Sequence, residues 1–110
     1  MDLFFKDRKI ERLCSNEKRQ LKKLGKVGAR RLQARLLDLR IALTLEELRK
    51  VPGRLHELTG NRKGQLAIDL DHPFRLIIEP TVDPPPQKAT GGIDWKQVDA
   101  VTIIEIKDYH

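Results

Sequence analysis

The chain has 110 residues, of which 39% are hydrophobic, and it carries a formal net charge of +6. This length supports one domain with one modest core and excludes a large ligand cavity. Lys and Arg outnumber Asp and Glu by 22 to 16, which favours a polyanionic partner such as nucleic acid, although a basic surface also suits solubility or an acidic protein partner.

The compartment is indicated by what the sequence lacks. The one cysteine, Cys14, has no partner for an internal disulfide, which fits a reducing compartment. The opening residues have too short an apolar run for a signal peptide, and no window approaches the roughly 18 apolar residues of a membrane span. We therefore expect a cytoplasmic protein that has no membrane partner.

The first part of the chain predicts a short strand and two helices. Leu3-Phe4-Phe5 is strand-like but has no hairpin partner nearby. A first helix follows Asp7 and ends at Gly25, and a second is expected over 27–41, joined to the first as an antiparallel hairpin. The buried positions expected for these helices are Ile10, Leu13, Cys14, Leu21, Leu24, Ala29, Leu32, Leu36, Leu39 and Leu43.

The middle of the chain predicts an antiparallel meander. Thr44 and Glu47 have the spacing of a capping box, so a short helical turn should begin at Leu45. Residues 55–75, LHELTGNRKGQLAIDLDHPFR, alternate apolar and polar positions between turn signals, which is typical of strands joined by tight turns.

The last part predicts a loop and a central strand. A proline-rich loop spans about 80–97, and the Val- and Ile-rich segment 100–106 reads as a strand covered on both faces. The element order predicts a single α+β domain over 1–110. Its two antiparallel helices should pack on one face of a mostly antiparallel sheet of about four strands.

No catalytic signature of a common kind is present. The sequence has no Gly-rich phosphate loop, no Cys/His zinc spacing and no serine elbow, and His56 and His72 are too far apart for a helical ligand pair. We therefore predict neither a metal nor a cofactor.

Cations in the meander are the first candidate functional residues. Arg62 and Lys63 could contact a phosphate beside the permissive Gly64, but by charge alone an ordinary solvated turn is the better explanation. Arg75 lies in mid-strand, where it needs a partner. An ion pair with Asp69 on the neighbouring strand and a substrate contact are equally well supported.

Other candidates have structural alternatives as well. Tyr109 and His110 follow a strand-like segment and could be held at the sheet, although terminal residues are often disordered. His56 fits a hydrogen-bonded structural histidine. The lysines of the first helix, Lys18, Lys22 and Lys23, fit either a solvated face or an RNA-binding surface.

The segment LRKVPGRLHELTGNRKGQLAIDLDHPFRLIIEP, followed by the ending VTIIEIKDYH, resembles the HigB-type killer toxins of the RelE/ParE superfamily. These are plasmid-maintenance proteins of toxin–antitoxin systems. The resemblance covers nearly the whole chain. It implies a small α+β fold and a ribosome-dependent endoribonuclease, or mRNA interferase, that needs no metal. It also implies a helix-turn-helix HigA-like antitoxin that forms a hetero-oligomer with the toxin.

Carried over by position, the resemblance implies a specific site. Lys63, Arg75, His110 and Tyr109 would be catalytic. The RNA-binding residues would be Arg62, His56, Lys18, Lys22 and Lys23. Two other functions stay open: a ParE-like inhibitor of DNA gyrase, and a non-catalytic basic module that binds nucleic acid.

The chain also departs from the family pattern. Leu66 and Ala67 stand where the family usually has an aromatic residue and a serine. The turn Asp71-His72-Pro73 replaces one of the Asn-Gly kind, and the proline-rich loop is longer than in compact members.

Overall fold

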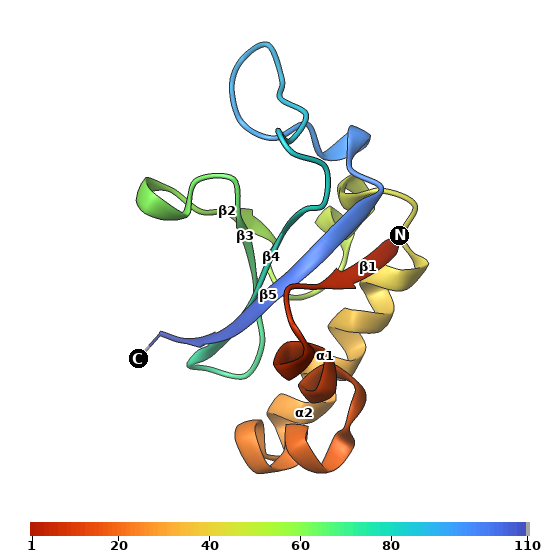
Figure 1. The fold of residues 1–110 in the computed structure, drawn as a ribbon, viewed down its shortest axis with the longest axis vertical. Helices are drawn as coiled ribbons and strands as arrows, with labels where there is room; N and C mark the ends of the chain where they lie inside the picture. Colours follow the sequence, from red (N-terminus) through yellow and green to blue (C-terminus); the bar gives the residue numbers. More distant parts are fainter. Residues whose placement is uncertain (110) are drawn as a thin grey trace.

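The computed structural model describes residues 1–109 and has two layers, helices on one side and a sheet on the other (Figure 1). The α+β class predicted from the sequence is confirmed. The helices are α1 (Arg8–Ser15) and α2 (Glu17–Ile41), and the strands are β1 (Asp2–Phe5), β2 (His56–Glu57), β3 (Leu66–Asp69), β4 (Phe74–Pro80) and β5 (Ala100–Asp108). Short 3-10 turns span Leu45–Lys50, Gly60–Arg62 and Trp95–Gln97.

The sheet has five strands in the order β1-β5-β4-β3-β2, one more than the approximate number expected. The predicted meander is confirmed, because β2, β3 and β4 pair antiparallel in sequence order. The late strand β5 lies between β4, to which it is antiparallel, and β1, to which it is parallel. The Leu3-Phe4-Phe5 run therefore finds its partner at the other end of the described chain.

The two faces of the sheet differ in what covers them. Apolar residues of α2, among them Leu32 and Leu36, pack with Leu66 and Leu76 in the main core. The opposite face carries only a small cluster of Ala67, Ile77 and Ile104, with Leu58 against it. We call this second side the open face. Nothing helical in residues 1–109 is long and apolar enough to cross a membrane.

The helices are divided differently from the prediction. Gly25 does interrupt the helical geometry, at φ 76° and ψ 178°, but α1 already ends at Ser15. Asn16 then caps α2, its side chain accepting a hydrogen bond from the N–H of Arg19 at 3.0 Å. Asn at this position is a strong helix-start signal, and the apolar periodicity concealed it.

Two residues expected in the core are exposed. Leu21 is 41% exposed because the break at Asn16 resets the phase of the helical pattern. Leu43 is 77% exposed because α2 ends at Ile41, so the helical spacing no longer applies. The predicted capping box of Thr44 and Glu47 is confirmed.

Cys14 lies in the core, and burial raises the pKa of its thiol to about 11 from the ordinary 9.0, partly opposed by the charge of Arg40. The folded state therefore holds the thiol proton more tightly than the unfolded state does. The stabilisation that this tighter proton binding gives the folded state is fully present below pH 9 and is lost as the pH rises from 9 to 11.

We expect the free energy of unfolding of the wild type, relative to Cys14→Ala, to fall by about 2 kcal/mol between pH 9 and pH 11. Urea unfolding of both proteins at intervals across this range measures the difference, and the comparison cancels the titration of lysines. A difference that stays constant with pH would contradict the assignment.

Gly53 occupies a turn that only glycine fits. Its φ is +109°, and a Cβ would lie 2.6 Å from Cγ2 of Ile68 and 3.0 Å from Cδ of Arg35. Its carbonyl accepts a hydrogen bond from the N–H of Asp69 at 2.6 Å, so the turn also holds the end of β3.

Gly53→Ala should lower the free energy of unfolding by more than about 2 kcal/mol, because a strained backbone and overpacking add together. Gly60→Ala is the matched control. Its φ is +65° with nothing within 4 Å of the added Cβ, so only the backbone term of about 1 kcal/mol applies. Equal losses in chemical denaturation would show that the contact with Ile68 is unimportant.

The proline-rich loop is hydrogen-bonded to β2 through the side chain of Glu57. This carboxylate accepts hydrogen bonds from the N–H of Ile93 at 2.9 Å and from the indole N–H of Trp95 at 3.2 Å. Trp95 is buried, and the guanidinium of Arg49 stacks on its ring at 4.0 Å. The loop projects from the sheet at the end away from α1 (Figure 1). Its later part thus belongs to the core.

Glu57→Ala should destabilise the protein by about 1–3 kcal/mol, since it leaves two donors without their acceptor. Trp95 is the only tryptophan, so its fluorescence should shift to the red as water reaches the ring. Glu79→Ala, which removes a half-buried carboxylate from β4, is the control and should leave the emission unchanged.

Candidate nucleic-acid interface

The open face carries charged side chains at the end of the sheet where β5 finishes. The register places Asp69 of β3 opposite Arg75 of β4, and Arg75 opposite Lys107 of β5. Residues paired in this way project to the same face. Arg75 therefore points away from the helices, as expected from its position between Phe74 and Leu76.

Arg75 has two partners. Its Nε lies 3.1 Å from Oδ1 of Asp69, so the ion pair considered from the sequence does form. Its guanidinium also lies 4.6 Å from the centre of the Tyr109 ring. Tyr109 is itself fixed, because its backbone N–H donates to the carbonyl of Pro73 at 2.9 Å. The structure thus brings together two of the predicted catalytic residues.

Arg54 also contacts Asp69, and no sequence pattern had marked it as a candidate site residue. Its Nε lies 2.9 Å from Oδ2 of Asp69, and its Nη2 donates to Oδ1 at 3.4 Å. The backbone of Arg54 has a φ of +48°, which is uncommon for a residue with a side chain. The Pro-Gly turn before Arg54 was predicted from the sequence. The position of Arg54 next to Asp69, however, depends on the pairing of β2 with β3.

Arg62 is tied to the last strand. Its Nη2 lies 2.8 Å from Oε2 of Glu105, and its Nη1 donates to Oε1 of Gln65 at 2.8 Å. The hydrogen bond to Glu105 raises the pKa of Arg62 above its already high ordinary value. Lys63 follows at the end of the 3-10 turn, where it is exposed and has no ion-pair partner within residues 1–109.

Two histidines lie close to these cations. His56 is half-buried on β2, with its Nδ1 2.8 Å from the carbonyl oxygen of Arg54, which fits its structural interpretation. His72 is exposed at the β3–β4 turn. With Arg75 and Tyr109 it lines a hollow of about 130 Å³.

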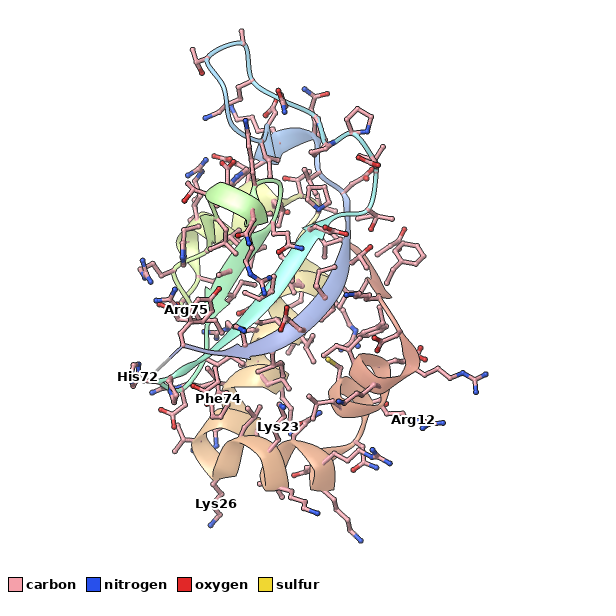
Figure 2. The ribbon with its side chains drawn as sticks, turned by 60° about the vertical axis from the view of Figure 1, so that its left-hand side comes forward. Arg12, Lys23, Lys26, His72, Phe74 and Arg75 are labelled. Carbon is pink, nitrogen blue, oxygen red and sulfur yellow. The ribbon has the colours of Figure 1, made fainter. Side chains whose placement is uncertain are left out.

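Three of the predicted RNA-binding residues belong to the other layer. Lys18, Lys22 and Lys23 are exposed on the first half of α2. Figure 2 shows Lys23 and Lys26 on the helical layer, below the turn that carries His72 and away from Arg75. These lysines therefore lie apart from the charged side chains on the open face. The predicted catalytic residue His110 lies outside the described residues.

The open-face cluster, which consists of Arg54, Arg62, Lys63, Asp69, Arg75, Glu105 and Lys107, has an excess of positive charge, although each of its arginines has a carboxylate partner. Arg54, Arg62 and Arg75 share the carboxylates of Asp69 and Glu105, and Lys63 and Lys107 add further cations. Such a surface suits a polyanion and offers a stacking ring beside a cation. Within residues 1–109 no group of three or more His, Cys, Asp or Glu side chains could hold a metal ion.

No protein-family model matches the chain, and no curated protein matches it.

Proposed function

We propose that the protein is the toxin of a toxin–antitoxin pair, a HigB-like member of the RelE/ParE superfamily that cleaves mRNA on the ribosome. The observation that carries the proposal is the placement of Arg75 against Tyr109 on the open face. A ring for a nucleobase and a cation for a phosphate adjoin there, on the face of the sheet where Arg62 binds Glu105, and Lys63 follows Arg62 in the chain. The sequence resemblance supplies the reaction.

The reaction is attack of the 2′-hydroxyl of one nucleotide on the adjacent phosphorus, which expels the 5′-oxygen of the next. Arg75 and Lys63 would stabilise the negative charge that develops on the phosphate oxygens. Tyr109 would stack on a base or donate a hydrogen bond to the RNA backbone. His110 would move the proton, since an imidazole can act as either a general acid or a general base near neutral pH.

The proposal includes a partner and a compartment. A helix-turn-helix HigA-like antitoxin would hold the toxin inactive in a hetero-oligomer and repress the shared operon. The toxin would act in the cytoplasm, where translating ribosomes are found, and Arg62 with the lysines of α2 would add salt-sensitive contacts to RNA phosphates.

A second candidate, a non-catalytic module that binds nucleic acid, is favoured by one observation. Each of the three arginines at the site already has a carboxylate partner. Cations paired in this way stabilise a developing negative charge less than free cations do. They still contribute to the electrostatic field that attracts a polyanion.

We expect Arg75→Ala and Lys63→Ala each to lower the rate of mRNA cleavage on translating ribosomes by about 10²-fold, the usual loss when one preorganised charge-stabilising group is removed. Lys50→Ala, which removes an exposed lysine from the turn at Leu45–Lys50, is the control and should cleave as the wild type does. A chain lacking His110 tests the proton-transfer role separately.

If Arg75→Ala, Lys63→Ala and the chain lacking His110 all cleave as fast as the wild type, the assigned site is wrong. Wild-type protein that binds RNA without cutting it indicates the binding module. Inhibition of purified gyrase without RNA cleavage would indicate the ParE-like alternative.

A further inference from the structure

Asp69 is the centre of the open-face cluster. Both of its carboxylate oxygens face arginine nitrogens: Oδ2 lies 2.9 Å from Nε of Arg54, and Oδ1 lies 3.1 Å from Nε of Arg75. Strand β4 and the segment before β2 thus each direct one guanidinium group at the single carboxylate that β3 carries. The side chain of Asp69 remains 34% exposed, so the anion can be reached from solvent.

Arginine binds a carboxylate and a phosphodiester through the same kind of contact. Each presents two oxygens that share one negative charge, and the planar guanidinium donates to either through parallel N–H groups. The space between Arg54 and Arg75 is therefore suited to a nucleic-acid phosphate. In this chain Asp69 fills it.

We propose that Asp69 is an internal competitor for the RNA phosphate, and that Arg54 is a phosphate-binding residue together with Arg75. The inference rests on the proposed function only in taking RNA as the ligand, and it does not require that the RNA be cut. RNA would bind by drawing one or both guanidinium groups away from Asp69, whose own charge then repels the incoming phosphate.

The exposure of the groups makes such an exchange feasible. The side chains of Arg54 and Arg75 are 63% and 31% exposed, and ion pairs open to water in this way are weak. Arg54 is the more exposed of the two arginines, while Arg75 also contacts the Tyr109 ring. The carboxylate of Asp69 therefore lowers the affinity of the site for RNA but does not prevent RNA from binding.

The test is the binding of a fluorescent single-stranded RNA oligonucleotide to the full chain, measured by anisotropy over a series of salt concentrations. Asp69→Asn keeps the shape of the side chain and removes its charge. We expect RNA to bind about tenfold more tightly, as for one added charge-assisted contact, and the slope of log K against log salt to steepen by about 0.7.

The increase in RNA affinity of Asp69→Asn should depend on Arg54. Arg54→Ala alone should weaken binding severalfold, and adding it to Asp69→Asn should remove most of the increase, because the released guanidinium is then absent. Arg30→Ala removes an exposed arginine from α2 and is the control for lost charge, with an expected change below about twofold.

Asp71→Asn is the matched control for the carboxylate. It removes the same charge two residues along the chain and breaks a comparable exposed ion pair, between Asp71 and Arg31 at 3.3 Å. An increase in affinity equal to that of Asp69→Asn would reduce the effect to net charge and overturn the inference. So would unchanged or weaker binding by an Asp69→Asn protein whose thermal melting matches the wild type.

The outcomes also separate this inference from the proposed function. If the wild type does not cleave mRNA but Asp69→Asn binds RNA more tightly through Arg54, the competition stands and the nuclease proposal fails. If the wild type cleaves while Asp69→Asn has no effect on RNA binding, the nuclease proposal stands and the competition fails. If neither protein binds RNA and the wild type does not cleave mRNA on translating ribosomes, both are wrong.

Discussion

The pairing of β5 with β4 is the constraint on which the rest of the structure depends. It supplies the apolar partners of the central strand, and its register decides which side chains of β5 face the helices. Ile77 pairs with Glu105 but the next residue, Ile78, pairs with Ile103, so Ile104 is an extra residue in β5. Such a β-bulge shifts the alternation of the strand by one position.

The bulge explains both the core and the charged cluster. With it, Ile103 and Ile106 both reach the main core although they are three residues apart. Strict alternation from Ile103 would instead turn Glu105 and Lys107 toward the helices and Ile106 toward solvent. The extra residue thus places Glu105 where Arg62 can bind it, and Lys107 beside Arg75.

The sequence was informative where the signals are local. The capping box at Thr44, the break at Gly25 and the meander all depend on residues near one another in the chain, as does the ion pair between Asp69 and Arg75 across a tight turn. The start of α2 at Asn16 had a local signal too, but the apolar repeat on both sides suggested one continuous helix.

What could not be predicted depends on contacts between distant segments. Nothing in the sequence states that β1 pairs parallel to β5, or that β5 carries a bulge. The convergence of Arg54 on Asp69 follows from a positive φ and a strand register together. Composition correctly indicated a basic protein, but it could not show that these arginines lie against carboxylates. That detail decides how strongly the surface attracts an anion.

The position of β5 in the sheet also has a consequence for folding. Because β5 inserts between β1 and β4, the sheet closes only when segments from the two ends of the described chain meet. Contacts at such long range form late in folding, after local hairpins. A chain in which only the meander has formed carries Arg62 and Arg75 but has neither Glu105 nor Tyr109 against them. The arrangement of the candidate site is therefore itself a signature of the completed sheet.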